Sequence, residues 1–278
     1  MWYRISARGL IRYEDAANKM AAILYPELKT LYQKYKSEIK ILRKEYNDIN
    51  QKASSYSKEQ MKPIINDYIQ KVKVVQDGLQ NDATNAFNSA RFVLNNTDLD
   101  NDFDFFIRLD FGSTWKGAYY NKEFYLSYLD MESEKDLAET IEHELVHNKQ
   151  FKEYGKTFTQ KKLRRIQNTP YFDNKLEMPA LATNILRELP TVSDYINDRF
   201  NVFKSSNPWA NFENFAVDEI NSLLKNSRNF QAFLEQSEWF WVLMYGDEDR
   251  QPIQKQYNKN KLIKILHEAI STQAKGIL

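Results

Sequence analysis

The sequence predicts a mostly helical α+β protein, and three observations carry this prediction. Apolar residues recur at steps of three or four along residues 24–49 and 64–79, aromatic and β-branched residues gather in residues 103–130, and residues 134–154 contain neither Gly nor Pro. The first and third patterns are typical of helices, and the second of short strands. A chain of 278 residues with 42% hydrophobic residues can also supply a sizeable core.

Residues 1–95 are expected to form a helical hairpin, the first of two domains. Between its two apolar series, Ser57 and Gln60 have the spacing of a capping box, so a second helix should start there. Pro63 should kink this helix or delay its start. The outer face of the hairpin is rich in Lys, and we interpret it as a solvated helix surface.

Residues 96–278 are expected to form the second domain, or one continuous domain with the hairpin. Short antiparallel strands should fill residues 103–130, and Asn121 and Lys122 form a polar pair between apolar runs. Ser133 stands at the head of the next helix, which should run through residues 134–154. Further helices are expected after Pro170, with the aromatic residues 239–245 in a buried helix.

Composition limits the possible functions. The 39 Lys and Arg residues nearly balance the 38 Asp and Glu residues, so no overall charge attracts the chain to nucleic acid. Nucleic-acid binding by the Lys-rich hairpin is therefore only a third hypothesis. The absence of cysteine excludes disulfides, thiolate ligands and a cysteine nucleophile, which leaves His, Asp and Glu as metal ligands.

The sequence also gives an expectation about location. It has no apolar segment typical of a signal peptide and no run of 18 apolar residues, so we expect a cytoplasmic protein without a membrane segment. The many Asn, Lys, Ile and Tyr residues suggest an AT-rich coding sequence, such as some phages and bacteria carry. Association with a phage or virion is therefore the alternative.

The functional prediction depends on HELVH, residues 143–147, inside the expected helix. Residues four apart share a helical face, so His143 and His147 can present two imidazoles to one ion. Glu144 projects about 100° from His143 and can reach a water on that ion. Zinc suits this arrangement, because Glu144 can accept the proton of a zinc-activated water that attacks a peptide carbonyl. The alternative is an ordinary amphipathic helix with two incidental histidines.

A catalytic zinc site needs a third protein ligand, and the later sequence offers four carboxylates for this position. They are Glu153, Asp173, Glu177 and Glu188. Glu153 follows His147 by more than one turn of the same helix and lies on another face, so it is a poor candidate. The residues alone leave the other carboxylates open.

HELVH and its preceding strands resemble the active-site helix of zincin metallopeptidases. Lys149 departs from the family pattern, which usually has a hydrophobic residue there, and NKQFKEY after the motif lacks the glycine and third histidine of metzincins. The resemblance covers roughly residues 104–190. It implies a zincin-like core in which a small antiparallel sheet lies next to the motif helix.

The segment that begins at Glu177 resembles the second helix of gluzincins, in which a glutamate is followed three residues later by a small residue, here Ala180. This resemblance implies a Zn²⁺ ion held by His143, His147 and Glu177. Asp173 is the alternative third ligand, as in an aspartate-type zincin.

The resemblance implies a zinc-dependent metalloendopeptidase that acts on a protein or peptide substrate, with Glu144 as general base. A zincin also offers a hydrogen-bond donor to the developing oxyanion, and Tyr154, Tyr171 and His267 are chemically able to do so. The alternative function is a structural or interaction protein, from a virus or phage, in which the hairpin is the working part and zinc only staples the fold.

Overall fold

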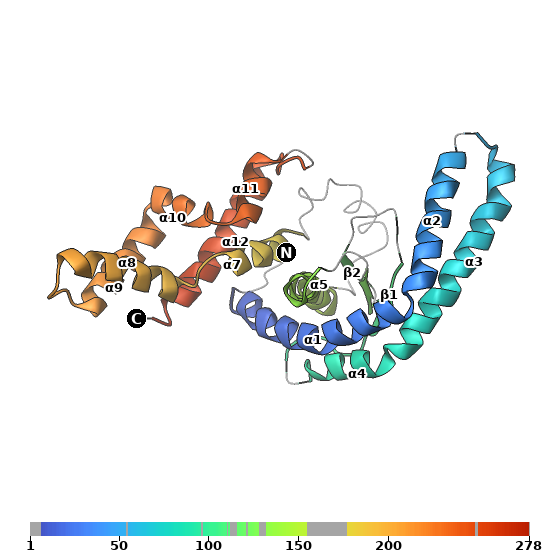
Figure 1. Cartoon of the computed structure of the whole chain (residues 1–278). Helices are drawn as coiled ribbons and strands as arrows, with labels where there is room; N and C mark the ends of the chain where they lie inside the picture. Colours follow the sequence, from blue (N-terminus) through green and yellow to red (C-terminus); the bar gives the residue numbers. More distant parts are fainter. Residues whose placement is uncertain are drawn as a thin grey trace. The chain divides into compact units, whose positions relative to one another are not determined.

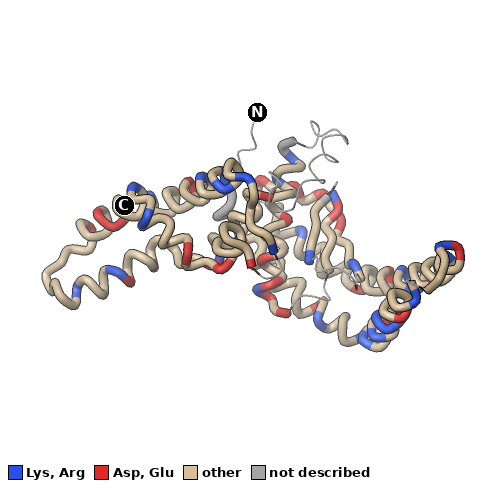
Figure 2. Tube along the Cα trace, turned by 90° about the horizontal axis from the view of Figure 1, so that it is seen from above, with Lys and Arg blue, Asp and Glu red and all other residues tan. Residues whose placement is uncertain are grey.

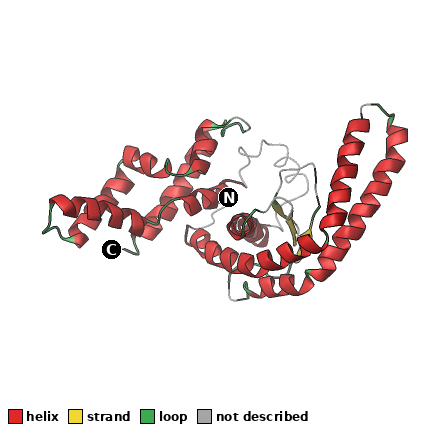
Figure 3. Ribbon diagram, in the orientation of Figure 1, coloured by secondary structure: helices red, strands yellow, loops and turns green. Residues whose placement is uncertain are grey.

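The structure is a computed structural model of the chain, and it describes residues 7–277 apart from 54, 96, 110, 112–115, 121, 128–131, 155–176 and 248–249. By their contacts the residues form two units, Ala16–Asn148 and Lys149–Leu278, and the second includes the chain up to Asp15. Figure 3 shows that the described chain is mostly helical with a small sheet, as the sequence predicts. The domain boundary expected between residues 95 and 96 stays a prediction.

Within the described part of the first 95 residues lie the helices α1 (Ala7–Lys34), α2 (Lys36–Lys52), α3 (Lys58–Asp82) and α4 (Thr84–Phe92). α2 and α3 run side by side as a two-helix arm (Figure 1). The long helix expected from residue 24 onwards is interrupted at Tyr35, whose hydroxyl donates a 2.8 Å hydrogen bond to Asp82. Gly78 leaves room for the Tyr35 ring, because a Cβ atom at Gly78 would lie 2.8 Å from the Tyr35 hydroxyl.

The start of α3 confirms the expected capping box. The Ser57 hydroxyl accepts a 3.3 Å hydrogen bond from the Gln60 N–H, and the Gln60 side chain accepts one of 2.9 Å from the Ser57 N–H. The cap satisfies two N–H groups at the helix terminus and fixes the first residue as Lys58. Pro63 therefore lies inside α3, and the expectation that it could delay the helix is wrong.

As far as the structure describes the chain, the sheet has three strands, β1 (Asp104–Ile107), β2 (Gly117–Tyr120) and β3 (Glu123–Leu126), in the order β1-β3-β2. β2 and β3 are antiparallel, as expected, and Lys122 between them has a φ of 67°. Asn121, the other expected turn residue, lies outside the described residues. The prediction that all strands are antiparallel is wrong for β1, which pairs with β3 in parallel. β1 pairs with β3 rather than with β2, the next strand along the chain, so the sheet is mixed.

One face of the sheet is buried. It carries Phe105 and Ile107 of β1, Tyr119 of β2, and Phe124 and Leu126 of β3. Phe87 of α4 stacks on Phe105 with ring centroids 5.0 Å apart, so α4 covers this face at β1. Such aromatic and β-branched packing is the main stabilisation that a sheet of three short strands can obtain.

The outer edge of β1 is covered by side chains of α3. The Gln80 amide accepts a 3.0 Å hydrogen bond from the Ile107 N–H and donates one to the Phe105 carbonyl, as a neighbouring strand would. One turn earlier, the Gln76 side chain accepts a 3.2 Å bond from the Leu109 N–H. Because an open strand edge can pair with other chains, this covering also protects the fold from aggregation.

The two helices expected around the functional residues are confirmed. α5 (Glu134–Tyr154) has the expected bounds, and the Ser133 hydroxyl caps it by accepting a 3.1 Å hydrogen bond from the Asp136 N–H. α7 (Glu177–Glu188) begins at Glu177 although Pro179 lies in its first turn. Proline is tolerated there, since the first N–H groups of a helix have no partner within the helix.

The unit Lys149–Leu278 continues with α8 (Val192–Ser206), α9 (Phe212–Lys225), α10 (Ser227–Leu234), α11 (Glu238–Tyr245) and α12 (Gln256–Ala274). α7 packs against α11 and α12. The expected helix at residues 239–245 is confirmed as α11, which buries Phe240 and Leu243 but leaves Trp241 about half exposed. No helix in the described part of the chain combines the length and apolar character that crossing a bilayer requires.

Candidate metal centre

Helix α5 brings the two histidines together. The ring centroids of His143 and His147 are 5.1 Å apart, and one ring nitrogen of each lies within 4.8 Å of the other. Two imidazoles that share a tetrahedral zinc at Zn–N distances of about 2.0–2.1 Å have ring centroids about 5 Å apart. The observed separation therefore suits two ligands of one zinc ion.

The general-base candidate Glu144 lies where α5 packs against β2. Thr140 and Glu144 share one face of the helix, and a Cβ atom built at Gly117 would lie 2.6 Å from Thr140 Cγ2 and 3.3 Å from Glu144 Cγ. The Glu144 side chain is only 5% exposed. The sequence did not single out Gly117, although a glycine inside a strand often marks a close approach of this kind.

We expect Gly117→Ala to destabilise the contact between β2 and α5. The new methyl group would overlap Thr140 Cγ2, and such overpacking typically costs about 1–3 kcal/mol. Adding Thr140→Ser removes that Cγ2 atom but keeps the hydroxyl that bonds the Asp136 carbonyl, so the double variant should recover most of the loss. Chemical denaturation of the two single variants and the double variant measures this coupling. Additive effects of the two substitutions would contradict the close approach.

A salt bridge and a buried phenol lie close to this contact. Lys116 and Asp136 form a salt bridge of 2.7 Å, which ties the start of β2 to the first turn of α5. Burial raises the pKa of the Tyr119 phenol on β2, and the charges of Asp100 and Asp102 raise this pKa further. Tyr119 therefore stays protonated across the physiological pH range.

Asn148 directly follows the second histidine and fixes α5 to the backbone of Asp100. Its side-chain oxygen accepts a 2.9 Å hydrogen bond from the Asp100 N–H, and its NH₂ group donates one of 2.8 Å to the Asp100 carbonyl. Asn148 is fully buried. No local sequence pattern indicates this role, because the bonded partner lies 48 residues away along the chain.

We expect Asn148→Ala to lower the free energy of unfolding by about 2–3 kcal/mol. The substitution leaves the N–H and the carbonyl of Asp100 without their partner, and an unsatisfied buried polar group costs about 1–3 kcal/mol. Asn101→Ala is the matched control, since Asn101 is exposed and its side chain bonds that of Asn95. If the two variants are equally stable in urea denaturation, the hydrogen bonds between Asn148 and Asp100 do not hold α5.

Of the four candidate third ligands, the structure describes the side chains of Glu177 and Glu188. Glu177 begins α7 in the unit Lys149–Leu278, whereas both histidines belong to the unit Ala16–Asn148, so Glu177 stays the predicted third ligand. Glu188 is occupied elsewhere, because its carboxylate accepts hydrogen bonds from the Ser237 hydroxyl at 2.6 Å and the Trp239 N–H at 2.9 Å. Asp173 and the side chain of Glu153 lie outside the described residues.

Of the three candidate oxyanion donors, the structure describes the side chain of His267. Tyr171 and the side chain of Tyr154 lie outside the described residues. His267 lies on α12, where its Nε2 is 3.0 Å from the Leu224 carbonyl and its Nδ1 is 3.4 Å from the Ser271 hydroxyl. Its ring also packs against Phe230, with centroids 4.9 Å apart. Both His267 nitrogens therefore have partners within the unit that contains α12.

Comparison with known proteins found no matching family model, no matching curated protein and no matching solved structure. The function is therefore inferred from the chemistry of these residues.

Proposed function

We propose that this chain is a zinc-dependent metalloendopeptidase with His143, His147 and Glu177 as metal ligands and Glu144 as general base. The observation that carries the proposal is the pair of imidazoles on α5, with centroids 5.1 Å apart and the buried Glu144 carboxylate between them in sequence. One helix thus supplies two ligands and a base, which is the composition that metal-assisted peptide hydrolysis requires.

The donor set fits a catalytic zinc better than a structural one. Two imidazoles and one carboxylate are the ligands of several zinc peptidases, whereas structural zinc sites usually have four protein ligands and no open position. The proposed ligand set has three protein ligands and so leaves one position open. Bound zinc would supply Lewis-acid chemistry and lower the pKa of a water toward neutrality.

The protein residues then have separate tasks. The imidazoles of His143 and His147 would hold the ion through neutral ring nitrogens, and Asn148 restrains the helix turn that carries them. The Glu144 carboxylate accepts a proton from the attacking water and passes it to the leaving amine. Packing of Glu144 against Gly117 restricts its side chain to few rotamers, so the base is already oriented before substrate binds.

The adjacent sheet edge supports a peptide as substrate. β2 is an outer strand, and within the described residues its ladder is formed with β3 alone. An extended peptide can add to such an edge through main-chain hydrogen bonds. Since Gly117 of β2 packs directly on Glu144, a peptide bound along β2 would pass close to the base.

Incubation of the zinc-loaded full chain with an unfolded protein tests the proposal. We expect internal cleavage products, their loss on addition of a chelator, and their return when zinc is restored. If no member of a broad peptide library is cleaved while chelation still lowers the melting temperature, the metal has a structural role and the alternative function replaces the peptidase.

A further inference from the structure

The arm formed by α2 and α3 carries a stripe of exposed side chains along α3. Its five members follow one another at steps of three or four residues and so share a helical face: Lys58, Lys62, Ile65, Ile69 and Lys73. We refer to them as the α3 stripe. Ile65 is 39% exposed and Ile69 51% exposed, although both are large apolar side chains.

The α3 stripe lies on the same helical face as the residues with which α3 covers the edge of β1. Gln76 and Gln80 follow Ile69 at helical spacing, and they bond the backbone of β1 and the residues after it. The second half of this face is therefore covered by the sheet, while the first half, which carries the two isoleucines, is exposed to solvent.

Two lysines on or next to the arm are paired with carboxylates. Lys71 of α3 bonds Asp67 at 2.9 Å and Glu45 at 3.2 Å, and Lys34 at the end of α1 bonds Asp82 at 2.7 Å. No carboxylate in the described part of the chain pairs with Lys58, Lys62 or Lys73. Their charge is therefore available to an anionic group from outside.

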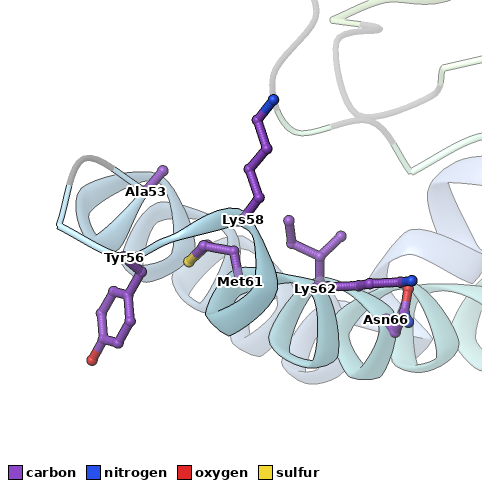
Figure 4. Close-up of a pocket in the computed structure, with 7 residues that line it drawn as sticks. Ala53, Tyr56, Lys58, Met61, Lys62 and Asn66 are labelled. Carbon is purple, nitrogen blue, oxygen red and sulfur yellow. The ribbon is translucent and has the colours of Figure 1, made fainter.

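A hollow of about 340 Å³ lies at the N-terminal end of the α3 stripe. Tyr56, Met61 and Ile65 give it apolar walls, and Lys58 and Lys62 border it. Figure 4 shows Lys58 extending away from α3, whereas Lys62 lies along the helix beside Asn66. The hollow can accept one large apolar side chain with a carboxylate next to it.

We propose that the α3 stripe docks an acidic amphipathic segment of a partner protein. An apolar side chain of the segment fills the hollow, its neighbours cover Ile65 and Ile69, and its flanking carboxylates pair with Lys58, Lys62 and Lys73. This is helix-in-groove recognition, with apolar anchors for affinity and complementary charge for orientation and association rate.

The charge pattern favours a protein segment over an anionic membrane. A helix that lies on a bilayer needs a broad apolar face and a basic polar face. The α3 stripe has only two isoleucines in line, and α3 also carries Glu59, Asp67 and Asp77. Figure 2 shows acidic and basic residues interspersed along the arm, which an anionic surface would repel as well as attract.

Selection from a displayed library of helical peptides, with the immobilised full chain as bait, tests this inference. Selected peptides should carry Asp or Glu on both sides of a large apolar residue. A synthetic selected peptide should bind Lys58→Glu/Lys62→Glu at least about tenfold more weakly than the wild type. It should also bind Ile65→Ser/Ile69→Ser more weakly.

Two variants on α2 are matched controls. Lys40→Glu/Lys44→Glu makes the same charge change on exposed residues of the same arm, and Ile41→Ser removes an isoleucine that is 58% exposed. Both should keep wild-type affinity. The inference is overturned if no peptide is enriched, if selected peptides bind Lys58→Glu/Lys62→Glu as well as the wild type, or if only phosphatidylserine vesicles bind the stripe. These outcomes do not depend on zinc or on hydrolysis.

Discussion

Glu144→Gln should keep its zinc and lose hydrolysis. Gln has nearly the size of Glu and can still donate and accept hydrogen bonds, so packing against Gly117 is preserved. It cannot accept a proton from water at neutral pH. Since general-base catalysis typically contributes about 10²–10⁴-fold, we expect kcat to fall by at least about 10²-fold. Zinc content and peptide cleavage, measured on the same preparation, separate the two effects.

Glu139→Gln is the matched control for this substitution. Glu139 lies on the same helix, and its partly exposed side chain is paired with Lys135 at 3.8 Å. It should turn over substrate like the wild type. Near-normal turnover by Glu144→Gln would remove the general-base role of Glu144, whatever the zinc content.

Glu177→Ala should weaken zinc binding by at least about tenfold. Substitution of residues that only support metal ligands already costs about 10–100-fold in affinity, so loss of a ligand should cost no less. Glu177 is the proposed third ligand beside His143 and His147. Titration against a chelator of known zinc affinity gives the dissociation constants of the wild type and the variant.

Asp173→Ala distinguishes the two candidate third ligands. If Glu177 is the ligand, Asp173→Ala should bind zinc nearly as tightly as the wild type. If Asp173→Ala empties the site while Glu177→Ala stays loaded, the ligand set is of the aspartate type. Equal melting temperatures of the metal-free proteins would show that neither substitution acts through unfolding.

The sequence predicted the helices around the site because their signals are local. Ser133 caps α5, and the capping box of Ser57 and Gln60 starts α3. Each of these signals lies within about one turn of the element that it defines. The spacing of His143 and His147 on one face is local in the same sense, so their proximity followed from the helix alone.

The sequence could not predict features that depend on distant residues. The parallel pairing of β1 with β3 is set by which strands meet, and the residue types of β1 do not encode it. Gly117 acquires its role only when β2 meets Thr140, and Asn148 only when α5 meets Asp100. For the same reason the residues alone left the third ligand open among several carboxylates.

The most direct measurement is the zinc content of purified protein by elemental analysis, after dialysis against a buffered competitor. His143→Ala should lose the metal, while the wild type and His267→Ala should each retain about one zinc per chain. His267 is the matched control, because its ring nitrogens are engaged by Leu224 and Ser271. If His143→Ala retains as much zinc as the wild type, or if the wild type binds none, these histidines do not form a zinc site and the peptidase proposal is wrong.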